Sequence, residues 1–408
     1  MTGGKGLTLV IQAAYFALIA RSLGASNYGA FVSVVALAGI LSPFSTLGSG
    51  NLLIKHVAQK TRTFSDLWGA VLSMTTLCGL GFLALVVLLA HFILPPAISM
   101  RLVLAVATAD LIGQNIALTA GQAFQAYEQL HWTAVITAGL SFSRLAAMVG
   151  LLAVQRHPTA LDWGYAYFIS TGVIMAIALY LVADRLGAPR LSLYESFADI
   201  REGFYFSASL SAQTIYTDID KTMLAKLDTL AATGIYGAAT RILDASFSPV
   251  AALLYAAYPG FFRAGQNGVK AAFTYARPLL KRALLFGCLL SAAMLLLAPL
   301  VPYVLGRQYA ETEAALRWLA PVPILRAAHY FLSDTLTGSG HQGLRTALQV
   351  GIAAFSVLIN LWLIPAYSWR GAAWSLIASN ALLVVAVAVA LLILARKPVL
   401  VEASVSVQ

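Results

Sequence analysis

Charged residues are scarce in this chain: of its 408 residues only 10% are Asp, Glu, Lys or Arg, whereas 60% are hydrophobic. A soluble domain carries about 25% charged residues, so this chain cannot cover the surface of a water-soluble globule. We therefore expect the lipid bilayer to be its solvent. A net charge of +10 would suggest nucleic acid in a soluble protein. Here the basic residues gather in certain loops, which indicates membrane topology and no nucleic-acid partner.

Residues that bind metals or form covalent intermediates are also few. The two cysteines, Cys78 and Cys288, lie in apolar stretches, and we expect both to be small buried side chains rather than a disulfide or a redox pair. The six histidines lack metal-binding spacing, and no nucleophile stands beside a base in a recognisable motif. The sequence therefore predicts no metal site and no catalytic residues.

Hydrophobic runs bounded by charges, glycine and proline predict about twelve membrane-spanning helices. No convincing cleavage site follows the first run, so we expect a membrane helix there rather than a signal peptide. The fold class predicted is an all-α integral membrane protein. The predicted spans are 6–21, 27–54, 66–93, 100–127, 131–155, 161–183, 204–227, 231–262, 279–305, 313–338, 342–364 and 369–395.

The basic residues of the loops are distributed unevenly between the two sides of the membrane. With the N-terminus in the cytoplasm, 15 Lys and Arg residues fall on the cytoplasmic side, 7 fall on the other side, and 4 lie inside helices. Cytoplasmic loops carry the excess of basic residues. We therefore expect both termini to be cytoplasmic.

The two halves of the chain are alike. The segment NYGAFVSVVALAGILSPF (27–44) resembles IYGAATRILDASFSPV (235–250): each opens with Tyr-Gly-Ala, and Ser-Pro follows 13–15 residues later. The longest polar stretch lies near residue 195. These features predict a duplicated six-helix unit, with one bundle at 1–195 and a second at 196–408. Transporters often have this organisation, with the site near the midplane between the halves.

Three segments carry a resemblance to a known family. They are ARSLGASNYGAFVSVVAL (20–37), TDIDKTMLAKLDTLAATGIYGAATRI (217–242) and GSGHQGLRTALQVGIAAFSVLINLWLIPAYSWRGAAWS (338–375). They are similar to the polysaccharide and oligosaccharide flippases (Wzx-like) of the MATE-like, or MOP, superfamily, and the resemblance covers nearly the whole chain. It implies a V-shaped pair of six-helix bundles around a central cavity that opens alternately to each side.

The resemblance also implies a function. The cargo would be an oligosaccharide on an undecaprenyl diphosphate carrier, moved from the cytoplasmic to the outer leaflet of the bacterial cytoplasmic membrane for the synthesis of O-antigen, capsule or exopolysaccharide. Membrane lipids and other polysaccharide assembly proteins would be the partners. No cofactor is expected beyond a coupling H⁺ or Na⁺.

Basic residues inside the predicted helices are the candidate cargo contacts. Each costs roughly 2.5–3.5 kcal/mol on insertion scales, so such residues are rare and face the interior. A diphosphate headgroup needs cationic groups inside the membrane. The candidates for binding it are Arg144, Arg326, Arg241 and Lys221, although pairing with a structural acid stays open for each.

Acidic residues inside the helices are candidates for ion coupling or gating. Asp218 and Lys221 are three residues apart on one helix, as are Arg241 and Asp244 on the next, and residues at this spacing share a face. We expect these two pairs to form one cluster of four charges. Asp220 would lie on another face of its helix. Asp110 and Asp334 are further acids in membrane helices; each would carry a coupling ion or pair with an arginine.

Two other functions are compatible with the composition. A MATE-type antiporter for drugs or cations would share the fold, but it needs acids in its cavity more than bases, and Arg144 and Arg326 favour an anionic cargo. A polymerase or ligase of the polysaccharide pathway would need a sizeable outer loop, and every predicted outer loop is short. We therefore expect a transporter without enzyme activity.

Overall fold

The computed structural model describes residues 2–59, 63–190 and 200–396. Every regular element in these ranges is a helix, and eight helices are long and apolar enough to cross a membrane. The protein is therefore an all-α integral membrane protein, as the sequence predicts. The expected division of the chain near residue 195 falls within 191–199, outside the described residues.

The elements before residue 190 form one group. They are α1 (Thr2–Thr46), α2 (Ser49–Gln59), α3 (Phe64–Ile93), α4 (Met100–Thr108), the π-helix η1 (Ala109–Gln114), α5 (Asn115–Ala126), α6 (Leu130–Val154) and α7 (Ala160–Arg185).

The elements after residue 200 form the other group. They are α9 (Ile200–Leu227), α10 (Leu230–Ser246), α11 (Ser248–Gly265), α12 (Val269–Leu297), the 3₁₀-helix η2 (Ala298–Leu300), α13 (Val301–Leu305), the 3₁₀-helix η3 (Arg307–Tyr309), α14 (Ala310–Leu319), α15 (Val322–Gly338), α16 (Gln342–Tyr367) and α17 (Trp369–Arg396).

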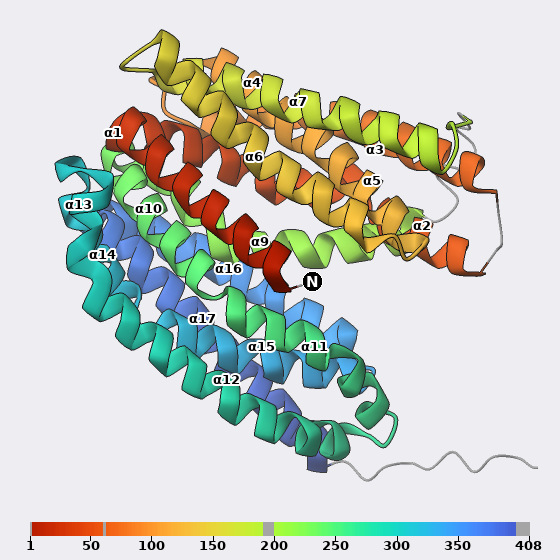
Figure 1. Ribbon diagram of the computed structural model, residues 1–408. Coiled ribbons are helices and arrows are strands. Elements are labelled where there is room, and N and C mark those ends of the chain that lie inside the picture. The colour runs from red at the N-terminus through yellow and green to blue at the C-terminus, as the bar shows by residue number, and fades with distance from the viewer. Residues whose placement is uncertain (1, 60–62, 191–199, 397–408) are drawn as a thin grey trace, which may run out of the picture.

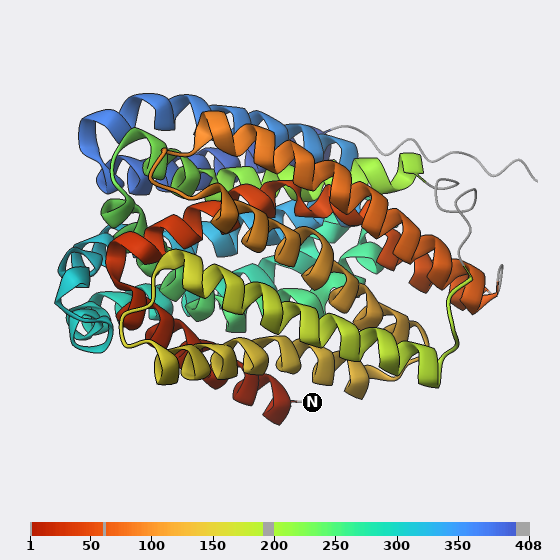
Figure 2. The same cartoon turned by 90° about the horizontal axis from the view of Figure 1, so that it is seen from above.

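The two groups of helices meet at one end of the molecule and diverge toward the other (Figure 1). The bend of α1, the start of α7 and the segment α13–α14 all lie at the end where they meet, and the view turned by 90° agrees (Figure 2). α1 packs directly against both α9 and α10 of the other group. The widely separated end carries α2 and the described end of α17.

The first two predicted spans, 6–21 and 27–54, are joined in the structure. Both lie in α1 and α2, and α1 bends at Gly24, whose φ of 72° and ψ of 168° are not helical. Glycine occupies positive φ at little cost because it has no Cβ. The sequence therefore predicted the two spans but not the sharp, loop-free bend between them.

Two other predicted spans are divided. The span 231–262 forms α10 and α11, which separate at Phe247, and 313–338 forms α14 and α15. Prolines stand in the first turn of both α11 and α15, where a missing N–H does no harm. Together with α9, these helices are short or charged and are not among the eight apolar spans. They are also the helices that carry most of the predicted charged site.

The expectation of two buried cysteines is wrong for Cys288, which is exposed on α12; Cys78 is partly buried, and both thiols are free. Leu285, Leu289 and Leu296 on the same helix are also exposed. In a membrane protein such an apolar exposed surface faces lipid, because hydrocarbon does not penalise exposed leucine as water does.

Candidate functional site

A cavity of about 400 Å³ lies between the two groups of helices. α1, η1, α6 and α7 line one side of it, and α9 and α10 line the other. Its walls carry an unusual number of polar groups for the interior of a membrane protein. These are Tyr15, Tyr28, Asp110, Gln114, Arg144, Tyr167, Thr214, Asp218, Lys221, Thr240, Arg241 and Asp244.

Among the described residues of the first group of helices, Arg144 is the only base that lines this cavity. Its Nη2 donates to Oε1 of Gln114 at 2.6 Å, and its guanidinium carbon lies 4.2 Å from the centre of the Tyr167 ring. A guanidinium over an aromatic face is stabilised by the ring quadrupole. Arg144 is therefore held by neutral groups and an aromatic ring, and it keeps its positive charge without a carboxylate partner in the described part of the chain.

Asp110 lies in the π-helix η1 on the same wall, and the Tyr167 hydroxyl donates to its Oδ1 at 2.6 Å. Tyr167 thus contacts the acid through its hydroxyl and Arg144 through its ring. A π-helical turn inside an α-helix is frequent at functional sites. Asp110 and Gln114, one turn apart, both face the cavity from this segment.

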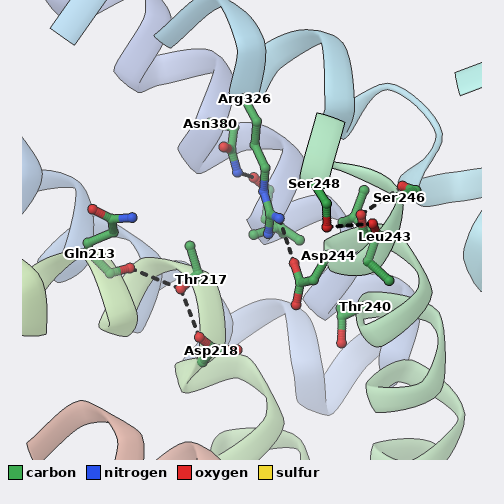
Figure 3. A network of polar contacts seen from close by, with 12 residues as sticks. Gln213, Thr217, Asp218, Thr240, Leu243, Asp244, Ser246, Ser248, Arg326 and Asn380 are labelled. Atoms are coloured by element: carbon green, nitrogen blue, oxygen red, sulfur yellow. Dashed lines mark hydrogen bonds and ion pairs between the residues drawn. The ribbon is translucent and has the colours of Figure 1, made fainter. Parts of the chain in front are cut away.

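Two ion pairs stand on the opposite wall. Lys221 pairs with Asp218 on α9, as their spacing predicts, and the Thr217 hydroxyl donates to Asp218 at 2.9 Å. Asp244 on α10 pairs with Arg326 on α15, with Nη1 and Oδ1 2.6 Å apart (Figure 3). Arg326 lies behind Asp244 and is only 6% exposed, and it is not among the residues that line the cavity.

The predicted Arg241–Asp244 pair is wrong, because the Asp244 carboxylate binds Arg326 instead. Arg241 lines the cavity, is exposed, and forms no ion pair with any residue that the structure describes. The cluster of four charges therefore has different members from those predicted: it contains Asp218, Lys221, Asp244 and Arg326. Arg241 lines the cavity beside them without an ion pair to any described residue.

Two of the predicted acids lie away from the cavity. Asp220 is buried on another face of α9, where it accepts hydrogen bonds from the Tyr236 hydroxyl and from the backbone N–H of Lys221. Asp334 pairs with Arg345 at 2.8 Å between α15 and α16. Both have the protein partners that a buried carboxylate needs, so the structure brings neither into the central site.

The neutral members of the site were not predicted from the sequence. Gln114 holds Arg144, Tyr167 bridges Arg144 and Asp110, and Tyr15 and Tyr28 line the cavity from α1. A signal for Gln114 was present, since it stands four residues after Asp110 in an apolar helix and residues at that spacing share a face. The tyrosines gave no such signal, because tyrosine also packs in ordinary cores.

A known protein family matches this chain over more than half of its length. The model described as "Polysaccharide biosynthesis protein" matches residues 1–264. The chain belongs to this polysaccharide biosynthesis family. The match covers α1 to α10 and all but the last residue of α11, and so includes every residue that lines the cavity. No curated protein matches the chain.

Solved structures show the fold of this member of the polysaccharide biosynthesis family. An inward-facing multidrug resistance MATE family transporter of the MOP superfamily superposes with a TM-score of 0.76 at 16% identity, covering 94% of this chain and 93% of that one. The lipid II flippase MurJ in an inward closed conformation also gives 0.76, at 10% identity, covering 95% and 86%. An outward-facing MATE family transporter gives only 0.63, at 16% identity, covering 96% and 95%.

Proposed function

We propose that this protein flips a lipid-linked oligosaccharide, carried on undecaprenyl diphosphate, from the cytoplasmic to the outer leaflet for surface polysaccharide synthesis. Its membership of the polysaccharide biosynthesis family and its fold, shared with transporters and a lipid flippase, support transport of this class. The prenyl chain would stay in the surrounding lipid while the diphosphate and its sugars cross through the cavity. No step of this process requires a chemical reaction by the protein.

One observation carries the choice of cargo: two arginines that form no ion pair with any described carboxylate line the cavity from opposite sides. Arg144 comes from α6 and Arg241 from α10, and both line the cavity together with Tyr15 of α1. Arginine binds phosphate oxygens through two parallel hydrogen bonds. The cavity can thus offer one guanidinium from each half to a diphosphate. The two guanidinium groups would move apart and come together again as the halves move.

The direction of transport in this proposal follows from the expected topology. The excess of basic residues in alternate loops favours cytoplasmic termini, and the end where the helices meet would then be the outer end. The cavity would then be closed on the outside, and a cytoplasmic cargo would enter from the end where the helices diverge. The higher TM-score with the inward-facing MATE transporter than with the outward-facing one agrees with this proposal.

A cation or drug antiporter is the second candidate, and the acids of the cavity favour it. Asp110, Asp218 and Asp244 line the cavity alongside three bases. However, Asp218 and Asp244 are already neutralised by Lys221 and Arg326. Among the described residues that line the cavity, one acid, Asp110, and two bases, Arg144 and Arg241, have no ion-pair partner. The excess of unpaired positive charge favours an anionic cargo.

Charge reversal at Arg144 tests the function. Arg144→Glu should abolish surface polysaccharide in a strain that depends on this protein, because a carboxylate at that position repels the diphosphate. The amount of protein in the membrane should stay near normal. Arg156→Glu, at an exposed position after the same helix, is the matched control and should keep the polysaccharide.

Normal polysaccharide with Arg144→Glu would reject the proposed cargo. If the variant is lost from the membrane, Arg144→Gln decides the question, since glutamine removes the positive charge without adding a negative one. A stable Arg144→Gln protein that still supports full polysaccharide synthesis would also reject it.

A further inference from the structure

The bend at Gly24 disturbs the backbone hydrogen-bonding pattern of α1. In an α-helix each N–H donates to the carbonyl four residues earlier, and the non-helical conformation of Gly24 interrupts this pattern. Ala20 and Ala25, on the two sides of the bend, are both buried. Buried backbone groups need partners, because an unpaired group costs free energy.

Residues from the other group of helices supply these partners. The Tyr309 hydroxyl donates to the carbonyl oxygen of Ala20 at 3.0 Å, and Oε1 of Gln308 accepts from the N–H of Ala25 at 3.3 Å. Gln308 and Tyr309 are consecutive residues of η3. A short segment of one half therefore forms two hydrogen bonds with the backbone of a bent helix in the other half.

A close helix crossing adjoins these hydrogen bonds. Gly29 of α1 lies against the backbone of α10, and Gly234 of α10 lies against the backbone of α1. Neither position has room for a side chain. A Cβ added to Gly234 would lie 2.7 Å from the carbonyl carbon of Ala25, and one added to Gly29 would lie 2.7 Å from the Gly234 nitrogen. Small residues allow helix backbones to approach in membranes. This crossing joins the two halves beside Tyr28, which lines the cavity.

We propose that these contacts form a latch that closes one end of the cavity and is released once in each transport cycle. The α1 latch consists of Ala20 and Ala25 with Tyr309 and Gln308, together with the Gly29–Gly234 crossing. It lies at the end where the two halves meet (Figure 1). Opening the cavity there requires α1 to separate from both α10 and η3. The latch rests on the proposed function only in assuming that the cavity opens to both sides.

The contacts of the latch suit repeated opening. Both hydrogen bonds join neutral groups, and each could be replaced by water when the halves separate. No ion pair crosses the latch among the described residues. Opening the latch therefore leaves no charged group without its partner. Losing one neutral hydrogen bond should shift the ratio of closed to open molecules roughly 2- to 12-fold. Gln308 and Tyr309 are thus positioning residues for the closed state and need not contact the cargo.

Labelling of a cysteine in the cavity measures this shift directly. In a protein without Cys78 and Cys288, Thr214→Cys places a single thiol on the cavity wall. A membrane-impermeant thiol reagent is applied to intact cells or to inverted vesicles. Tyr309→Phe or Gln308→Ala should raise the labelling rate from outside roughly 2- to 12-fold, and Gly234→Ala should raise it further by forcing the helices apart.

Matched controls separate the latch from general loosening of the fold. Tyr303→Phe changes a tyrosine that is 82% exposed near the same segment, and Gly172→Ala changes a helical glycine with no atom within 4 Å of the added Cβ. Both should label like the parent protein. Each variant is first checked for an unchanged gel-filtration profile in detergent. If Tyr309→Phe does not fold, Gln308→Ala is used as the test variant in its place.

The labelling experiment tests the latch without any cargo present. Unchanged external labelling in both Gln308→Ala and Gly234→Ala would overturn the latch, as would an equal rise in the controls. Equal labelling from both sides in the parent protein would also overturn it, because the cavity would then have no closed end. A failure of the cargo assignment would appear only in the polysaccharide assay, while the labelling shifts would remain.

Discussion

Removing Asp244 from its pair with Arg326 tests which of the intramembrane charges hold the fold together. Arg326 is almost fully buried, and its Nε has no hydrogen-bond partner among the described residues. Arginine does not lose its proton in proteins, so Asp244→Asn would leave a buried positive charge. Breaking a buried ion pair costs about 3–5 kcal/mol.

For Asp244→Asn we expect a loss of stability at the lower end of this range of 3–5 kcal/mol. The Asp244 side chain is 44% exposed to the cavity, so water screens the pair on one side. We expect a loss of about 3 kcal/mol, which corresponds to a melting temperature lower by roughly 6 °C at about 2 °C per kcal/mol. Asp244→Asn combined with Arg326→Met should recover most of this loss, because no unpaired charge remains.

Thermal stability in detergent is the assay: the purified variants are heated, and the fraction that still elutes as a single gel-filtration peak is measured. Asp184→Asn is the control, since Asp184 pairs with Arg185 on an exposed surface and such pairs are worth less than about 1 kcal/mol. If Asp244→Asn melts like Asp184→Asn, the buried pair does not stabilise the fold as described. A double variant that melts below the single one would also contradict this role of the pair.

Two further predictions use the same melting assay. Asp218→Asn together with Lys221→Met should be milder than either change alone, because the two charges neutralise each other; a loss greater than the sum of the single changes contradicts this. Tyr167→Phe removes the hydroxyl that donates to the buried Asp110 and should cost about 1–3 kcal/mol, whereas Tyr180→Phe, at an exposed position of the same helix, should cost nothing measurable.

Local spacing allowed part of the site to be predicted from the sequence. Asp218 and Lys221 are three residues apart on one helix, and helical geometry alone brings them together. Arg144 and Arg241 were identified as cavity residues because a base inside an apolar span is costly and almost always faces a protein interior or a wet cavity. The membrane class and most spans followed from the length of the apolar runs.

Contacts between distant helices could not be predicted in this way. Asp244 has a base three residues before it and another 82 positions away on α15, and it pairs with the distant one. Which base it meets depends on how α10 and α15 pack, and the sequence pattern of either helix leaves this open. The same applies to Gln114 and Arg144, which are 30 residues apart. The bend of α1 depended on one glycine conformation, which composition does not reveal.

The π-helix η1 has a consequence for how α4 and α5 are aligned with each other. Each of its hydrogen bonds spans five residues instead of four, so η1 holds one more residue than an α-helical segment with the same total turn. A residue inserted into a regular α-helix would rotate everything after it by about 100°, and the wider π-helical turn absorbs that rotation. Deleting a single residue within Ala109–Gln114 should therefore convert η1 into α-helix and leave α5 close to its present orientation, with Asn115 still facing Ser42 of α1, to which it donates at 3.1 Å. The same deletion within α5 itself would instead turn the rest of that helix away from its neighbours.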